Sequence, residues 1–285
     1  MPPYRRLHHL ALALCCAGVG VASADEAVPS TAPAASASAS AAAKRNGWEG
    51  VVGVTANLHS GRLGDGSTVF KLRPAFYLRY GRLTITNTSG FVSRRTEDVV
   101  RGLGVDLLNS DRVSLGVALR YDGGRPQKSN DAYKGLGNIK PTLRVRLLAS
   151  RRLDGPWRMG ASWNVDTLGR GGGGFGDLSL GWEHPLSPDT TLTVGSSLNI
   201  GDRRYMQTYF GISPAQSLTS VYAPYNVRAG VRDIGTAATL RHDIGSDWTL
   251  LASAGVSRRL GQAAASPLTR NPNGWGLSAA AGWRF

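Results

Sequence analysis

The chain has 285 residues, with 33 Lys and Arg against 19 Asp and Glu, so its formal net charge is +14. Glycine supplies 37 residues spread along the whole chain, about 13% where ~7% is usual, which argues against a long coiled coil. The longest apolar run, residues 10–22, is shorter than the ~20 residues that a spanning helix needs, so a helical membrane protein is excluded.

Residues 1–24 have the pattern of an export signal. Arg5 and Arg6 give a positive start, and an apolar run follows over residues 10–22. Ala22 and Ala24 are then the small residues of a cleavage site, in the spacing that a signal peptidase accepts. We therefore expect the mature chain to begin at residue 25 and to act outside the cytoplasm.

Both cysteines of the chain, Cys15 and Cys16, fall inside this signal. The mature chain is then expected to have no disulfide and no thiolate metal site. Residues 25–46 consist mainly of Ala, Ser and Pro. Because such a segment buries too little surface to offset its ordering entropy, we interpret it as a flexible periplasmic linker of ~25 Å reach, ahead of a domain over residues 47–285.

From Trp48 onward, apolar and polar residues alternate with period two. Trp157, Met159 and Ala161 share one face, for example, opposite Arg158 and Gly160. Successive side chains of a strand point to opposite faces, so each alternating segment predicts a strand with one apolar side. We predict twelve strands, with ten as the alternative count, over residues 48–59, 68–80, 82–88, 101–108, 112–122, 139–149, 156–167, 175–184, 190–201, 230–241, 247–259 and 274–285.

A soluble sandwich and a membrane barrel both alternate in this way. Small hydrophilic residues on the polar faces, aromatic residues at segment ends, and connections that are short after every even strand favour the barrel. A ~10-residue strand tilted by ~45° covers about 23 Å, which matches the apolar band of an outer membrane. The predicted fold is a transmembrane antiparallel β-barrel, located in the outer membrane of a Gram-negative bacterium.

The last third of the chain carries a more specific pattern. It holds Tyr205, Met206, Tyr209, Phe210, Gly211, Ser217, Tyr225, Gly230 and Asp233, followed by Ser266 and Pro267. This pattern resembles the MipA/OmpV family of outer-membrane proteins, and the terminal Trp283-Arg284-Phe285 looks like the signal read by the outer-membrane assembly machinery. The sequence departs from the family at Gln262 and Ala265, where aspartates are more frequent.

The resemblance implies a function for the barrel as well as its location. The family is named for a member that interacts with a membrane-bound lytic transglycosylase, and one member is described as a scaffold joining such an enzyme to a bifunctional murein synthase. Other members are discussed as porin-like channels or adhesins. The resemblance therefore implies an envelope scaffold first, and a porin-like channel as the alternative.

Catalytic and cofactor motifs are weak in this sequence. The mature chain has three histidines, His59, His184 and His242, and neither a Gly-x-Ser-x-Gly elbow nor a Cys/His cluster. Residues 169–174 satisfy G-x-G-x-x-G, but a strand is predicted to follow where a nucleotide site needs a helix, so we interpret the segment as a flexible hairpin loop. We expect no enzyme activity, no cofactor and no metal, while a lipid enzyme would need a Ser beside a His on one face.

Charged residues on the polar faces are expected to line the lumen. The cations are Lys71, Arg73, Arg79, Arg120, Arg144, Arg146, Arg158 and Arg241, and their candidate partners are Glu49, Asp106, Asp166, Asp177, Glu183 and Asp233. One interpretation is a weakly anion-preferring pore. The other is a cross-lumen network that stiffens a closed barrel, because unpaired buried charges are costly.

The predicted outer loops hold two further features. Arg94, Arg95, Arg101, Arg125, Lys128 and Lys134 are expected to meet lipid-A phosphates of lipopolysaccharide. Aromatic side chains crowd residues 202–229, and we predict that this loop folds back over the barrel mouth, since so many would not stay in water. On the periplasmic side, the turn over residues 150–155 is the candidate contact for murein enzymes; nucleic acid is not an expected partner of an exported barrel.

Overall fold

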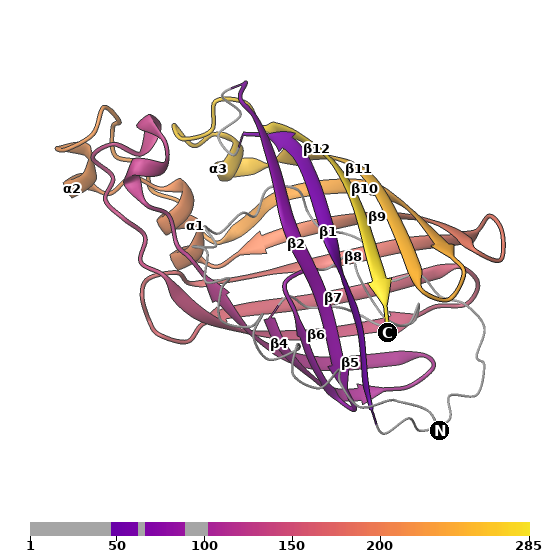
Figure 1. The fold of residues 1–285 in the computed structure, drawn as a ribbon. Coiled ribbons are helices and arrows are strands. Elements are labelled where there is room, and N and C mark those ends of the chain that lie inside the picture. Colours follow the sequence, from indigo (N-terminus) through magenta and orange to yellow (C-terminus); the bar gives the residue numbers. More distant parts are fainter. Residues whose placement is uncertain (1–46, 62–65, 89–101) are drawn as a thin grey trace, which may run out of the picture.

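The computed structural model describes residues 47–61, 66–88 and 102–285 and shows a closed antiparallel β-barrel (Figure 1). Each strand pairs with its neighbours in the sequence, and the last strand pairs with the first. The predicted barrel is confirmed, with twelve strands instead of ten. The export signal, the linker, and Arg94, Arg95 and Arg101 lie outside the described residues.

The strands lie close to the segments predicted from the alternation. Their bounds are β1 Trp48–Ser60, β2 Thr68–Tyr80, β3 Leu83–Thr86, β4 Gly102–Asn109, β5 Val113–Asp122, β6 Thr142–Arg152, β7 Trp157–Asp166, β8 Gly174–Pro185, β9 Thr190–Gly201, β10 Gly230–Ile244, β11 Trp248–Arg259 and β12 Asn273–Arg284.

The seam between β1 and β12 closes the cylinder. Their register runs from Val51 opposite Arg284 to His59 opposite Gly276. At Gly53 the two backbones approach so closely that an added Cβ would lie 2.0 Å from the carbonyl oxygen of Ala281. A glycine is therefore required where the first and last strands meet.

The two faces of the wall follow the alternation in the sequence. On β11, Leu250, Ala252 and Val256 are exposed on the outside, whereas the residues between them are half-buried on the inside. On β2, Phe70 and Leu72 are among the most exposed apolar side chains and flank the inward Lys71. A ring of exposed apolar side chains is stable only in contact with lipid, so the outer surface is the membrane-facing one.

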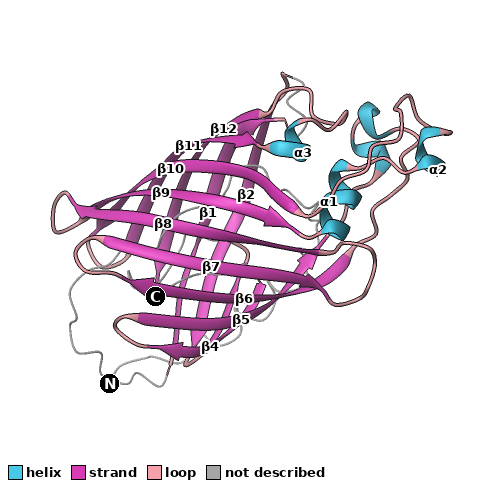
Figure 2. Ribbon diagram, turned by 180° about the vertical axis from the view of Figure 1, so that it is seen from behind, coloured by secondary structure: helices cyan, strands magenta, loops and turns pink. Residues whose placement is uncertain are grey.

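The two ends of the barrel differ. Short turns and both described termini lie at one end, and the helices and long loops lie at the other (Figure 2). Short turns are periplasmic in barrels of this class. The opposite end carries η1 Gln127–Ser129, η2 Asp131–Tyr133, α1 Arg203–Phe210, α2 Pro214–Ser217 and α3 Gly261–Ala264.

No helix within the described part of the chain is long and apolar enough to cross a membrane.

Several strand ends differ from the predicted bounds. β6 begins at Thr142 instead of residue 139, because Pro141 has no N–H to donate and Ile139 pairs with Arg125 in a separate bridge. β6 and β10 continue to Arg152 and Ile244, so the turns predicted over 150–155 and 242–246 are shorter. The charged residues at these strand ends interrupt the apolar–polar alternation of the sequence, although their backbones still pair with the neighbouring strands.

Candidate functional site

The lumen-facing charges cluster at both ends of the wall. Six ion pairs join Arg79 to Asp106, Arg144 to Asp122, Arg146 to Asp177, Arg232 to Asp233, Arg241 to Asp243, and Arg284 to Asp243. Each links residues on one strand or on strands at most two apart. These six pairs thus run along the wall.

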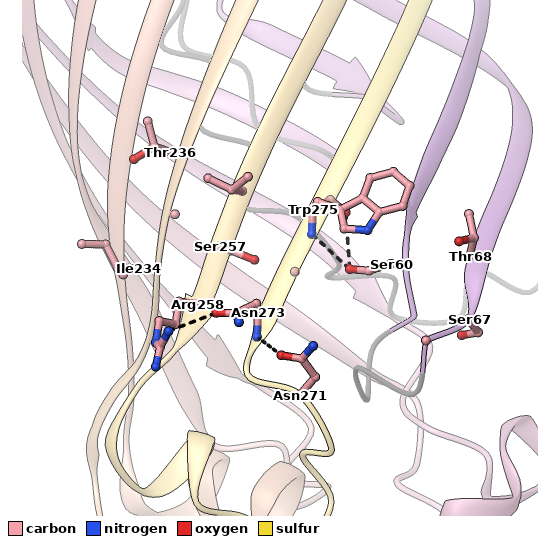
Figure 3. Close-up of a pocket in the computed structure, with 14 residues that line it drawn as sticks. Ser60, Ser67, Thr68, Ile234, Thr236, Ser257, Arg258, Asn271, Asn273 and Trp275 are labelled. Carbon is pink, nitrogen blue, oxygen red and sulfur yellow. Dashed lines mark hydrogen bonds between the residues drawn. The ribbon is translucent and has the colours of Figure 1, made fainter.

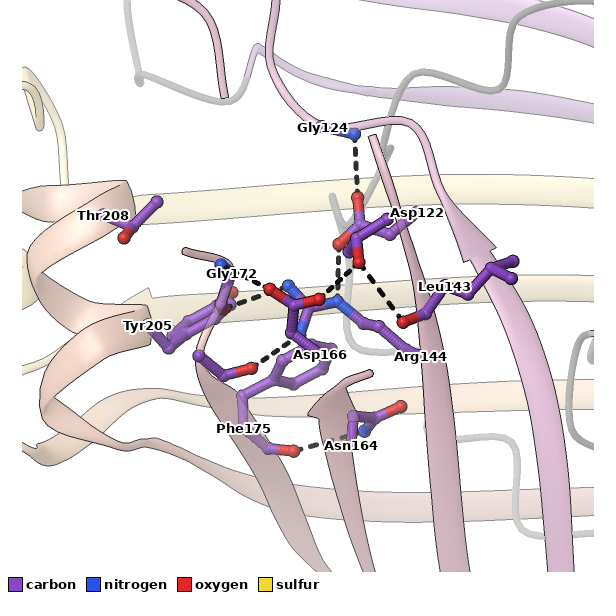
Figure 4. Close-up of polar contacts among 12 residues, drawn as sticks. Asp122, Gly124, Leu143, Arg144, Asn164, Asp166, Gly172, Phe175, Tyr205 and Thr208 are labelled. Atoms are coloured by element: carbon purple, nitrogen blue, oxygen red, sulfur yellow. Dashed lines mark hydrogen bonds and ion pairs between the residues drawn. The ribbon is translucent and has the colours of Figure 1, made fainter. Parts of the chain in front are cut away.

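Arg144 is the centre of the cluster beneath the long loops. Its side chain is only 1% exposed, and Nε donates to Oδ2 of Asp122 at 2.6 Å. Nη1 and Nη2 donate to the carbonyl oxygens of Gly173 and Gly172 at 2.8 and 3.0 Å (Figure 4). The guanidinium also lies 5.0 Å from the ring centroid of Phe175. One arginine thereby fixes β5, β6 and the β7–β8 loop together.

The glycine segment 169–174 is a hairpin loop between two strands, as predicted, but part of it is tightly held. Asp166 accepts a hydrogen bond from the backbone N–H of Gly172 at 2.9 Å and another from the Thr142 hydroxyl. Gly173 has a φ of +58°, and a Cβ there would lie 2.2 Å from the backbone nitrogen of Tyr205. The loop presents carbonyl groups to Arg144 and makes room for α1, a role that its nucleotide-like spacing does not reveal.

A second cluster lies at the end with the short turns. Arg241 donates to Asp243 at 3.1 Å, and Arg284 reaches the same carboxylate from β12. The hydroxyl of Thr249 also donates to it, at 2.9 Å. Asp243 therefore joins β10, β11 and β12 near the periplasmic rim.

The structure places the remaining sequence candidates around the same inner wall. Asp177 accepts from Ser162 and Arg146, and Asp233 accepts from Asn199 at 2.7 Å. Strand pairing puts the others on the inward parity: Lys71, Arg73, Arg120, Arg158, Glu49 and Glu183. Asp122, Asp243 and Arg284 share that face but were not among the sequence candidates; their inward parity on β5, β10 and β12 was the signal that could have found them.

The long segment 202–229 folds onto the barrel mouth. Asp202 caps α1 by accepting from the backbone N–H of Tyr205 at 2.7 Å. Tyr205 and Met206 are 4% and 1% exposed and pack with Phe175, Val227 and Ala263. The prediction that this aromatic-rich loop packs back on the barrel is confirmed.

Three loops interlock into a single cap. Ala132, Tyr133 and Leu136 of the β5–β6 loop pack with Ile212 and Leu268 from the other two loops. Polar contacts across the loops add to this packing. The side-chain amide of Gln216 donates to the carbonyl of Leu136 at 2.6 Å, and the hydroxyl of Thr219 donates to the carbonyl of Gly135 at 2.7 Å. The hydroxyl of Ser266 donates to the carbonyl of Phe210 at 2.6 Å.

Arg125 has a different place from the one expected. It is 4% exposed and stacks over the ring of Tyr133 at 4.3 Å, so the prediction that it meets lipid phosphates is wrong. A basic residue between strands is expected at the surface because of its charge, whereas the folded cap encloses Arg125. Lys128 and Lys134 are exposed.

Comparison with protein families identifies the chain. The model of the MltA-interacting protein MipA family matches residues 35–285. The chain belongs to the MipA family. It is therefore an outer-membrane β-barrel protein of a Gram-negative bacterium.

Solved structures resemble this MipA-family barrel in fold only. An outer membrane channel from Pseudomonas putida F1 is 12% identical over 86% of this chain and 97% of its own, with a TM-score of 0.42. The outer membrane channel DcaP of Acinetobacter baumannii is also 12% identical, over 84% and 96% of the two chains, with a TM-score of 0.38. Comparison with curated protein sequences gives no match.

The residues that carry the resemblance to the MipA family gather in the cap and the strand beside it. Tyr209 and Phe210 pack partly buried beside Tyr205, and the backbone of Tyr225 pairs with Ile212. The rest lie at element ends or near them: Gly211 after α1, Ser217 at the end of α2, Gly230 at the start of β10, Asp233 in β10, and Ser266 and Pro267 after α3.

Gln262 stands where the MipA family more often has an aspartate. Its side-chain oxygen accepts from the backbone N–H of Arg228 at 2.8 Å, and its carbonyl accepts from the hydroxyl of Tyr225 at 3.0 Å. A neutral amide oxygen thus joins two loops of the cap here. Ala265 closes α3 by donating its N–H to the carbonyl of Gly261 at 3.1 Å.

The described residues offer little for catalysis. Thr190 and His242 lie 2.9 Å apart on the outer wall and form a hydroxyl–imidazole contact. A nucleophile–base pair needs a third group to orient the base, and the structure shows none on His242. His184 stacks on Trp182 near the rim, and the described ranges hold no cluster of three or more His, Cys, Asp or Glu that could bind a metal.

Proposed function

We propose that this barrel is a non-enzymatic scaffold that holds murein enzymes at the inner surface of the outer membrane. Support comes from the description of its family, which names an interaction with MltA. A lytic transglycosylase, and with it a bifunctional murein synthase, is the class of partner that the resemblance implies.

The observation that carries this proposal is a basic sector on the periplasmic rim. It consists of Arg82, Arg112, Arg151 and Arg152, which lie at or next to three consecutive short turns. The backbone N–H of Arg152 donates to the carbonyl of Arg112 at 2.8 Å, so two of these turns are in contact. The same turns also carry Asp111 and Asp154, which leaves a net charge of +2 on this side, whereas the other short turns carry Asp189 and Asp247 and no Lys or Arg. One side of the rim therefore suits an acidic surface on a periplasmic protein.

Binding of a purified transglycosylase tests the proposal. The barrel in lipid nanodiscs is titrated with the enzyme lacking its lipid anchor, and the dissociation constant is measured at two salt concentrations. Binding that weakens with salt and falls by tenfold or more in Arg112→Glu/Arg152→Glu supports the proposal. The matched control is Lys128→Glu/Lys134→Glu, with the same charge change at the opposite end. Absence of binding, or equal loss in both variants, would refute it.

A porin-like channel is the second candidate. The six ion pairs that run along the wall favour it, because none of them crosses the lumen. The three-loop cap would then act as the constriction. Discrete conductance steps in planar bilayers, with a preference for anions, would support a channel, and a silent barrel of correct heat-dependent gel mobility would exclude it.

A further inference from the structure

A groove lies on the outer wall of the barrel, near the end that carries the cap. It has a volume of about 600 Å³ and is formed by β10, β11, β12 and the ends of β1 and β2 (Figure 3). This groove is separate from the lumen charges and lies at the opposite end from the basic periplasmic sector.

The part of the groove farther from the cap is apolar. Ile234, Val256 and Trp275 line it from three adjacent strands, and Val256 is 62% exposed. Strand pairing places Val256 beside Trp275, on the same outward parity as the apolar residues of the membrane-facing surface. This apolar part of the groove suits the binding of a hydrocarbon chain.

The part of the groove nearer the cap contains a cation that faces outward. Arg258 has the parity of Val256 and is exposed. Ten residues separate it from Trp248 at the other end of β11, which at ~3.3 Å per residue and a tilt of ~40° corresponds to about 25 Å along the membrane normal. That distance is the height of the apolar band, so with Trp248 at one interface Arg258 lies at the other, where a charge on the lipid face costs little.

Polar groups surround Arg258. Its Nη1 donates to the side-chain oxygen of Asn273 at 3.3 Å, and the side chain of Asn271 accepts from the backbone N–H of Asn273 at 2.9 Å. Ser60 accepts from the backbone N–H of Trp275 at 3.1 Å. The residues that line the groove include Arg258 and no Asp or Glu, so the local electrostatic field favours an anion.

We propose that this groove binds lipid A, the membrane anchor of lipopolysaccharide. A phosphate on its glucosamine headgroup accepts hydrogen bonds from Arg258, and one acyl chain lies along Ile234, Val256 and Trp275. The position selects this lipid, because the long-loop end of a barrel faces the outer leaflet. The planar guanidinium suits a phosphate, which accepts two of its N–H groups at once.

Lipid retention measured by native mass spectrometry tests this assignment. The full barrel in detergent is titrated with bisphosphorylated lipid A, with dephosphorylated lipid A and with phosphatidylglycerol. The wild-type protein is expected to retain the bisphosphorylated form at least about tenfold better than the dephosphorylated form, since a hydrogen bond to a charged group contributes about one order of magnitude in affinity. It is also expected to retain it better than phosphatidylglycerol, which has a phosphate but no glucosamine headgroup.

Two variants separate headgroup from chain. Arg258→Gln is expected to remove the preference for the bisphosphorylated form, whereas Val256→Trp fills the apolar part and weakens all three lipids while keeping the cation. Arg170→Gln, at an exposed arginine of the β7–β8 loop outside the groove, is the matched control and should leave the retention of all three lipids unchanged. Heat-dependent gel mobility verifies that each variant is folded. Equal retention of lipid A and phosphatidylglycerol, or an Arg258→Gln variant that binds like wild type, would overturn the proposal.

Discussion

The buried ion pair beneath the cap gives the most specific prediction about stability. Replacing Arg144 by Met keeps a long side chain but leaves the carboxylate of Asp122 without its 2.6 Å partner. The carbonyl groups of Gly172 and Gly173 lose their donors in the same step. Because Asp122 is almost fully buried, its charge has little water to replace the guanidinium.

The size of the effect follows from burial. Removing one member of a buried pair costs about 3–5 kcal/mol, whereas an exposed pair contributes about 0–1 kcal/mol. Arg146 lies two residues further along the same inner face and pairs with Asp177 at 3.2 Å, with each side chain about a quarter exposed. Arg146→Met is therefore the matched control, and we expect it to cost at most about 1 kcal/mol.

Urea unfolding in lipid vesicles, followed by tryptophan fluorescence, measures both variants. A second-site change sharpens the test: Asp122→Asn removes the negative charge but keeps an oxygen for the backbone N–H of Gly124, which donates at 3.0 Å. The double variant Arg144→Met/Asp122→Asn should regain most of the stability lost by Arg144→Met. Equal losses in Arg144→Met and Arg146→Met, or no recovery in the double variant, would refute the reasoning.

Two further substitutions test the cap and the membrane-facing surface. Gly173→Ala places a methyl group 2.2 Å from the backbone nitrogen of Tyr205, so α1 should be displaced and cleaved faster by protease. The control is Gly169→Ala, where φ is +63° and the space around the residue is open, and it should leave α1 protected. Leu240→Arg puts a cation at mid-height on the lipid face and should cost about 2–4 kcal/mol in vesicle unfolding, whereas the inward Ala237→Arg should cost less than about 1 kcal/mol.

The strands were predictable because each residue of the wall faces either lipid or the lumen, so apolar and polar side chains must alternate. Trp157, Met159 and Ala161 alternate with polar residues in the sequence, and their strand spans Trp157–Asp166. The rule weakens where a strand leaves the membrane. Arg151 lies in a strand at such an end, where water accepts charges on either face, so polarity no longer marks a boundary.

The cap and the charge clusters could be predicted less well from the sequence. The aromatic density of residues 202–229 predicts packing but neither α1 nor its contact with Ala263, which comes from a distant loop. The outward position of Arg258 follows from its parity on β11, but the groove around it is formed by strand and loop ends that are far apart in the sequence. Tertiary contacts between loops have no periodicity, so a single sequence does not specify them.

Lipid on the outside and water on the inside is the central claim, and cysteine labelling along β11 tests it most directly. Single cysteines at Ala252 and Ser253, in the mature chain without other cysteines, carry a fluorophore that nitroxide-labelled lipids can quench. The label at position 252 should be strongly quenched by lipid, and that at 253 should respond only to a water-soluble quencher. Equal quenching at the two positions would contradict a closed membrane barrel.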